Sequence, residues 1–321
     1  SGPLMFQDAN GVSEIISLQF FIEKAVDENA LEFGDGYPSS TSIETISGTS
    51  DADIFVFGDD AAHSQSQLTI LGLGGDDEFF FGSNAAAEAG SSISISNLDG
   101  EQTYRFLGGA AAGGGHIAIE TGNGDHRFDF EYSVRGNGSL SVNSGDGNKS
   151  LSLWDAGKSG SLSAQFGDGD HRILLGGRNS FEGGTASIEL GNGDHSFTGQ
   201  FGAYADVEIT SGSGEQSYYF YSDGFAWGVL NLTTGAGAQS FSFNGDAARG
   251  GVVNISAGEG GDSFLFYEDS ASLGGVITLD LGVDADVDTV NLGFRPETIV
   301  IQNYVVGVDA KVNVDGDEEG G

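Results

Sequence analysis

Apolar and polar residues alternate in short runs along most of the chain, and these runs recur at a nearly constant interval. Aligning the first apolar residue after each glycine-rich turn gives Phe55, Phe79, Tyr104, Phe128, Leu151, Ile173, Phe197, Tyr218, Phe241, Phe264 and Val290. Neighbouring members of this series are 21 to 26 residues apart. The residue two places further on is apolar in every copy except one, where it is Gly199. A spacing of two is typical of a β-strand with one buried face.

A second alternating segment lies about halfway through each repeat, for example Ile93/Ile95 and Ile117/Ile119. One repeat therefore reads as a strand, a loose turn rich in Gly, Ala and Ser, a second strand, and a tight glycine turn. A single unit of this kind cannot bury its apolar face, whereas stacking places each strand beside its copy in the next unit. The pattern predicts an all-β fold, a parallel β-solenoid of about 11 coils with a period of about 23 residues and two strands per coil. At roughly 4.8 Å per coil the rod is about 50 Å long.

The two ends of the chain depart from the repeat. Residues 1–45 lack it and are predicted to cap the first coil, because a solenoid must cover its open edge strands. The repeats occupy residues 46–292. Residues 293–314 are predicted to form strands that close the other end, and the acidic residues 315–321 to be a disordered tail.

Composition restricts the classes of partner. The 321 residues include 11 Lys and Arg against 48 Asp and Glu, which gives a formal net charge of −37. Phosphate contacts need cationic side chains, so we expect neither nucleic-acid binding nor contact with anionic membranes. No apolar run approaches the ~20 residues of a membrane helix, so no membrane insertion is expected. The acidic excess suits an extracellular surface or cation binding, and the simpler alternative is that it only keeps the protein soluble.

The glycine turns have a recognisable form, read as G-L-G-G-D-D-E-F-F-F from Gly72 and as A-G-E-G-G-D-S-F-L-F from Ala257. This phrase resembles the RTX repeat, Gly-Gly-x-Gly-x-Asp-x-Φ-x with Φ apolar, of secreted bacterial toxins, proteases and adhesins. Gly72, Gly75, Asp77 and Phe79 match its first, fourth, sixth and eighth positions. In that family the turns hold Ca²⁺ between stacked coils through Asp carboxylates and backbone carbonyls, which is the oxygen ligation that a hard cation requires. The resemblance implies Ca²⁺ as a cofactor, and its candidate ligands here are Asp51, Asp53, Asp76, Asp77, Asp262, Asp286 and Asp288.

The central repeats depart from this family pattern at the position of the calcium-binding Asp. Their residues there are Gln102, His126, Lys149, His171, His195, Gln216 and Gln239. None of these is a carboxylate, and an ammonium group repels Ca²⁺. RTX repeats also have a glycine turn on both sides of the coil, whereas this chain has one per coil. We therefore expect Ca²⁺ at the outer coils rather than the middle ones.

The sequence Gly-Asp-His recurs three times, ending at His126, His171 and His195. Stacking would bring His171 and His195 together, and two imidazoles with nearby carboxylates suit a transition metal such as Zn²⁺. A pH sensor and an Asp-His catalytic pair are alternatives. The simplest interpretation is that these are polar turn residues that hydrogen-bond to the neighbouring coil.

The chain carries no nucleophile elbow, no phosphate-binding loop before a helix, and no Cys. We therefore expect that the chain is not an enzyme. We expect it to be a structural or adhesive β-solenoid segment of a bacterial secreted or cell-surface protein. One alternative is a solenoid that binds or modifies carbohydrate, with Trp154, Tyr219, Tyr221 and Trp227 as stacking platforms. Another is a surface-layer or filament unit. The expected partners are accordingly a surface polysaccharide or further copies of the chain.

Overall fold

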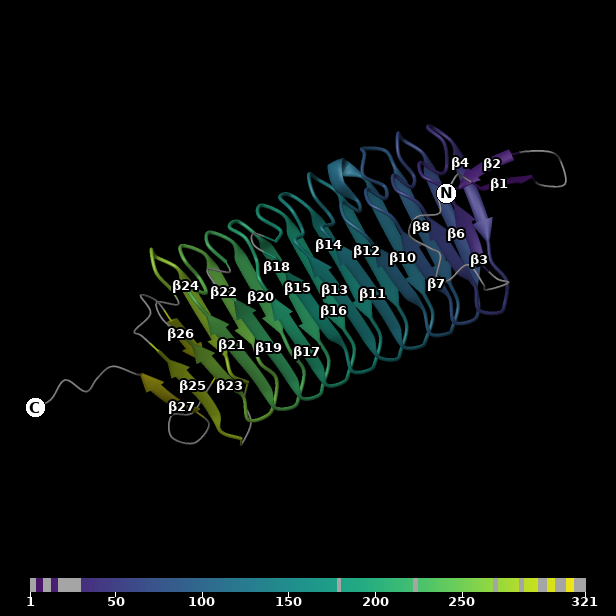
Figure 1. Ribbon diagram of the computed structural model, residues 1–321. Helices are drawn as coiled ribbons and strands as arrows, with labels where there is room; N and C mark the ends of the chain where they lie inside the picture. Colours follow the sequence, from purple (N-terminus) through teal and green to yellow (C-terminus); the bar gives the residue numbers. More distant parts are fainter. Residues whose placement is uncertain are drawn as a thin grey trace, which may run out of the picture.

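The computed structural model describes residues 4–7, 13–16, 30–177, 180–221, 225–267, 271–282, 286–293, 299–303 and 310–314. Within these residues the chain winds into a rod of stacked β-strands, with the described N-terminal and C-terminal strands at opposite ends (Figure 1). The predicted fold is confirmed: it is an all-β parallel solenoid of about 11 turns, built from two sheets.

Consecutive strands alternate between the two sheets, which we call the odd sheet and the even sheet after their strand numbers. The odd sheet contains β3 (Ala30–Phe33), β5 (Ile54–Phe57), β7 (Glu78–Phe81), β9 (Thr103–Phe106), β11 (His126–Glu131), β13 (Lys149–Trp154), β15 (Arg172–Gly176), β17 (His195–Gly199), β19 (Gln216–Tyr221), β21 (Gln239–Asn244), β23 (Ser263–Phe266), β25 (Asp288–Leu292) and β27 (Ala310–Val314). The even sheet contains β4 (Ile43–Ser47), β6 (Gln67–Leu73), β8 (Ser92–Asn97), β10 (His116–Thr121), β12 (Ser139–Ser144), β14 (Ser161–Phe166), β16 (Thr185–Leu190), β18 (Asp206–Ser211), β20 (Val229–Thr233), β22 (Val252–Ser256), β24 (Val276–Asp280) and β26 (Ile299–Gln302).

Three short elements lie outside these two sheets. Strands β1 (Leu4–Gln7) and β2 (Ser13–Ile16) pair with each other in antiparallel orientation, and η1 (Ala112–Gly114) is a single 3-10 turn. At the N-terminal side, β3 pairs with β5 and β4 with β6, so residues 30–47 already supply strands to both sheets. The division into caps, repeats and tail stays a prediction, and residues 17–29 and 315–321 lie outside the described part of the chain.

Parallel pairing in strict register brings equivalent residues of successive coils together. In the odd sheet Phe55 pairs with Phe79, and Phe79 with Tyr104, and their rings stack at centroid distances of 4.8 and 4.9 Å. A second ladder runs beside the first, in which Phe81 and Phe106 stack at 4.3 Å. These rings are almost fully buried between the two sheets. Offset stacking of this kind adds about 0.5–1.5 kcal/mol per pair to the burial of apolar surface.

At Gly199, where the sequence pattern breaks, an aromatic ring from elsewhere in the chain takes the missing place in the aromatic column. Phe201, two residues further along the chain, is 3% exposed, and its ring packs beside Phe197 and Phe220. A Cβ on Gly199 would lie only 2.6 Å from Cε2 of Phe201. The glycine therefore makes room for a ring that enters the core from the following turn.

The turns predicted to be loose are regular and contribute to the core. Several carry a pair of small residues, such as Ala61/Ala62 and Ala85/Ala86, with no exposed surface. The second Ala of these two pairs has a left-handed backbone, with φ of 52° for Ala62 and 48° for Ala86. Its amide donates to the preceding coil, as from Ala86 to the carbonyl of Ala61 at 2.8 Å. Larger side chains take the same place in other turns, as at Phe181, which is fully buried with φ of 56° and whose amide donates to the carbonyl of Ala156 at 2.9 Å.

Candidate functional site

The residues at the sixth position of the turn phrase form one buried column through the rod. Every member, whether acidic, amide, imidazole or ammonium, is at most 3% exposed. The members are Asp53, Asp77, Gln102, His126, Lys149, His171, His195, Gln216, Gln239, Asp262 and Asp288. Because buried polar groups must be hydrogen-bonded, the chemistry of this column is decided by the backbone around it.

Side chains of the column accept hydrogen bonds from the backbone of the preceding coil. The amide of Asp53 donates to Oδ1 of Asp77 at 2.9 Å, and the amide of Asp262 donates to Oδ1 of Asp288 at 2.8 Å. In the middle of the rod an imidazole takes the same role, since the amide of Lys149 donates to Nδ1 of His171 at 3.2 Å. An Asp carboxylate and a neutral His are thus interchangeable here as acceptors.

The histidines are held neutral with the proton on Nε2. Their Nδ1 atoms accept from a backbone amide, so Nε2 donates to the carbonyl four residues earlier, from His171 to Gly167 at 2.7 Å and from His195 to Gly191 at 2.9 Å. Burial lowers the pKa of His126 and His171 to about 4 and also lowers the pKa of His195. The predicted Zn²⁺ site at His171 and His195 stays a prediction, and a metal there must displace one of these backbone partners.

The ammonium group of Lys149 lies among the carbonyl groups of the glycine turns. It donates to the carbonyls of Gly124, Asp146 and Gly147 at 2.6, 2.8 and 3.1 Å. Gln102 and Gln239 make similar contacts, donating from Nε2 to the carbonyls of Gly75 and Gly214 in the preceding coil. The central repeats therefore place donors where the resemblance to RTX repeats implies carbonyl ligands. Burial lowers the pKa of Lys149 to about 8, against the opposing effect of Asp125 and Asp146.

The first coils have a different character, because oxygen atoms converge there. Oδ2 of Asp77 accepts from Nδ2 of Asn97 at 3.1 Å, while the buried Oδ1 of Asn97 has no hydrogen-bond partner. Both Oδ1 of Asn97 and Oδ2 of Asp77 lie close to Gly72, where an added Cβ would collide with them. Burial, together with Asp53 and Asp76, raises the pKa of Asp77 to about 6, although the amide of Asp53 opposes the shift. Carboxylate and amide oxygens of this kind are the ligands that a hard cation takes in proteins.

The other predicted calcium ligands are divided between the two ends of the rod. Asp51 and Asp76 are exposed near the start, and Asp286 is exposed near the end. Asp76 accepts the amide of Glu101 at 2.8 Å, so it already has a structural role. Within the described residues, no group of three or more His, Cys, Asp or Glu side chains is placed to hold a metal ion. A site at Asp77 would therefore depend on Asn97 and on backbone oxygens, which a search for acidic clusters in the sequence misses.

Many remaining acids form ladders along the outside of the glycine turns. Asp99 accepts the amide of Asn123 at 2.7 Å, Asn123 accepts that of Asp146, and Asp146 accepts that of Asp168 at 2.9 Å. Asp and Asn both occur in this row because each supplies the same acceptor oxygen. Part of the acidic excess therefore serves to bind one turn to the next.

A groove with aromatic edges lies on the outer side of the odd sheet. Trp154 ends β13 and pairs with Gly176 of β15, and Tyr221 ends β19. Between them is a hollow of about 620 Å³ that is also lined by Thr198, Gln200 and Asn244. Trp154 is 49% exposed and Tyr221 is 46% exposed, so both rings present a face to solvent.

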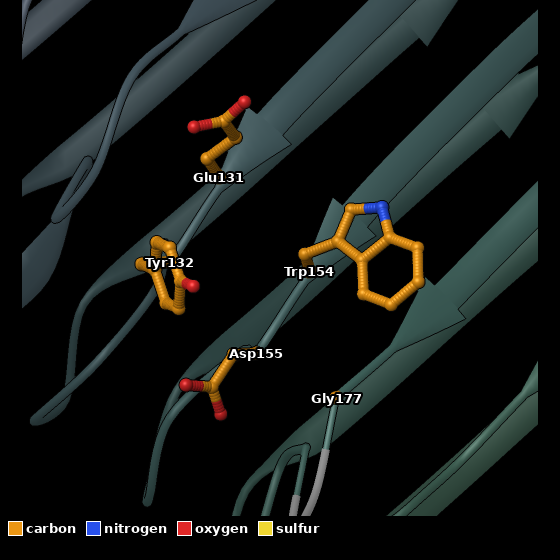
Figure 2. A pocket seen from close by; sticks show the side chains of 5 residues that line it. All are labelled: Glu131, Tyr132, Trp154, Asp155 and Gly177. Carbon is orange, nitrogen blue, oxygen red and sulfur yellow. The ribbon is translucent and has the colours of Figure 1, made fainter.

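A second hollow adjoins Trp154 on the side of the preceding coil. Figure 2 shows Glu131 and Trp154 at the ends of their strands, with Tyr132 and Asp155 in the turns that follow. The guanidinium of Arg135 bonds to Asp155 at 2.6 Å and lies 5.5 Å from the ring centre of Tyr132. This pairing reduces the local negative charge beside the groove.

The other aromatic residues expected to be platforms lie apart from Trp154. Trp227 stacks on Tyr204 with ring centres 5.9 Å apart, in the turns between the odd and even sheets. Tyr219 meets Tyr221 edge to face at 4.4 Å and supports its ring. The four aromatic residues predicted as stacking platforms are thus divided between two separate surfaces. One contains Trp154, Tyr219 and Tyr221, and the other contains Trp227.

No helix in the described residues is long and apolar enough to cross a membrane. Comparison of the chain with protein-family models, with curated proteins and with solved structures finds no match.

Proposed function

We propose that this chain is a non-enzymatic structural segment of a secreted or cell-surface protein, acting as a rigid rod that spaces or displays the parts attached to it. The observation that supports the proposal is the continuity of its ties from coil to coil. Both sheets pair without interruption, from β3 to β27 and from β4 to β26. The buried column and the outer Asp/Asn rows add side-chain hydrogen bonds in the same direction. Bending the rod must therefore break several ladders at once.

The location is tested on intact cells of the source organism. An antibody raised against the rod should label unpermeabilised cells, and external protease should remove the labelling. Labelling only after permeabilisation would contradict a surface role. Small-angle scattering at increasing protein concentration tests the rod itself. We expect a particle about 50–60 Å long whose mass stays constant, whereas growth in mass would favour the filament or surface-layer alternative.

The same proposal includes Ca²⁺ at the N-terminal coils, bound near Asp77. The support is the convergence of Oδ2 of Asp77 and the unpartnered Oδ1 of Asn97 close to the backbone at Gly72, which the absence of a Cβ there allows. A divalent cation would supply the positive charge that the buried Asp77 lacks, and binding only to the folded state would stabilise it. We further propose that the parent protein is a bacterial adhesin similar to RTX proteins.

A further inference from the structure

The indole of Trp154 packs against Gly176 of the neighbouring coil, where no side chain is present to exclude it. A Cβ on Gly176 would lie 2.9 Å from Cε3 and 3.0 Å from Cζ3 of the indole. The ring therefore covers Gly176 on one side, while about half of the side chain remains open to solvent. A large aromatic ring that is exposed and packed against the backbone in this way is typical of a recognition surface.

The groove continues from Trp154 along the axis of the rod. Strand β17 lies between β15, which carries Gly176, and β19, which carries Tyr221. Trp154 and Tyr221 are thus three coils apart, or about 14 Å. Polar side chains lie between and beyond the rings, namely Thr198, Gln200 and Asn244. A straight trough with an aromatic ring at each end suits an extended polymer rather than a compact ligand.

The side chains and charge around the groove restrict the class of polymer that it can bind. The strands beneath it pair with neighbours on both sides, so this face has no free edge that a peptide could join as an added strand. A net charge of −37 disfavours polyanions such as nucleic acids and acidic glycans. Pyranose rings present C–H faces that pack on aromatic rings, and their hydroxyls pair with amide and hydroxyl side chains. The spacing of successive coils is also close to that of successive sugars in an extended chain.

We propose that the groove between Trp154 and Tyr221 binds an uncharged, extended polysaccharide of β-1,4-linked hexoses, with sugar rings stacked on both aromatic side chains. This proposal goes beyond the role as a rod and does not depend on it. A rod without glycan affinity would still space other parts, and a failure of surface labelling would leave the groove intact.

Tryptophan fluorescence provides the first test, because the chain has only two Trp residues. In the Trp227→Phe variant all tryptophan emission comes from Trp154. Titration with β-1,4-linked glucose and mannose hexamers should change this emission saturably for at least one of them. In the reciprocal Trp154→Phe variant, the emission of Trp227 should not respond. Equal amounts of an α-1,4-linked glucose hexamer and of a galacturonate hexamer serve as controls for chain shape and charge.

Calorimetric titration then measures the contribution of each residue. We expect Trp154→Ala and Gly176→Val, which forces the indole away from the coil, to lower the affinity about tenfold or more. Tyr221→Ala should have a smaller effect in the same direction. Leu98→Ala, which removes an exposed apolar side chain elsewhere on the rod, should leave the affinity unchanged. Since Gly176→Val can disturb folding, circular dichroism is recorded for each variant, and the surface change Trp154→Ala decides the outcome. Failure of both β-1,4-linked hexamers to bind, binding of the galacturonate or α-linked hexamer alone, or full affinity in Trp154→Ala would overturn the proposal.

Discussion

The amide of His171 donates to Nδ1 of His195 at 3.3 Å, and the two imidazoles stack with their centres 4.8 Å apart and nearly parallel. Each Nε2 lies against a glycine carbonyl of its own turn. Protonating either ring would remove the acceptor that the backbone amide needs. Protonating both would place two positive charges side by side in a buried column. The structure thus depends on these rings being neutral.

Acid should therefore weaken the fold through its histidines. The folded-state pKa of His171, about 4, lies below the ordinary value of 6.5, so between these values only the unfolded chain takes up the proton. The stabilising contribution is complete above pH 6.5 and is lost as the pH falls towards 4, by roughly 2 kcal/mol for this ring at pH 5. Urea unfolding at pH 7 and pH 5 measures the loss.

The matched control replaces His171 and His195 with Gln, the residue found in the same column at position 216. Gln216 donates to the carbonyl of Gly212 four residues earlier, as the histidines do to theirs. The double variant should lose clearly less stability than the wild type between pH 7 and pH 5. Equal losses in both proteins would contradict a role for these imidazoles in acid sensitivity.

Asp77 should produce the opposite dependence on pH. Its folded-state pKa of about 6 lies above the ordinary value of 3.8, so its contribution favours folding at pH 4 and is lost as the pH rises through 6. Without added metal, Asp77→Asn should raise stability at pH 7 by up to roughly 2–3 kcal/mol, because an amide keeps an acceptor for Asp53 without the buried charge. Urea unfolding in EDTA at pH 7 and pH 4 measures this, and the gain should vanish at pH 4.

Calcium should reverse the order of stability of the wild type and the Asp77→Asn variant. If Ca²⁺ binds beside Gly72, millimolar Ca²⁺ should raise the melting temperature of the wild type at pH 7.5, and Asp77→Asn or Asn97→Leu should abolish the rise. Asp168→Asn is the matched control, since it changes an acid of the outer ladder and should leave the response intact. Identical melting curves in Ca²⁺ and in EDTA for the wild type would exclude calcium stabilisation at this site.

The fold was predictable from the sequence because a solenoid repeats one short structural unit. Apolar residues two apart, as at Phe79 and Phe81, reveal the strand, and the interval of about 23 residues reveals the stacking. The pattern did not reveal that Phe201 enters the core in place of a residue at Gly199, because Phe201 lies in the turn that follows the end of β17. It also presented the Ala pairs as loose turns, since small residues carry little periodic signal although they are buried.

The candidate sites were less predictable, for a physical reason. Lys149 and His171 occupy equivalent positions but make different hydrogen bonds, one donating to carbonyls and the other accepting an amide. Residue type alone cannot show which backbone group a buried polar side chain will meet. Likewise Asn97 comes from the even sheet and meets Asp77 only after folding. The aromatic groove is assembled from four successive coils, so no local motif marks it.

Lys149 tests whether the buried ammonium is structural. Removing its charge and donors with Lys149→Met leaves the carbonyls of Gly124, Asp146 and Gly147 without this donor, which should cost about 2–4 kcal/mol of unfolding free energy. Lys149→Gln should cost less, since Gln102 and Gln239 serve such carbonyls elsewhere in the column. Urea unfolding at pH 7 separates the two variants. A Met variant as stable as the wild type would show that water replaces the ammonium without loss.

The pairing of Gly199 with Phe201 should appear as strong coupling between two substitutions. Phe201→Ala opens a cavity in the core and should cost about 3–5 kcal/mol. Gly199→Leu alone drives a side chain into a ring whose Cε2 is 2.6 Å from the new Cβ, so it should destabilise as well. Combined, the two changes restore the ordinary column, in which the neighbouring coil carries Leu175, and the double variant should be more stable than the sum of the single losses by about 1–3 kcal/mol. Urea unfolding of all four proteins gives the coupling energy. Strictly additive losses would mean that Phe201 fills a space of its own rather than the one that Gly199 leaves.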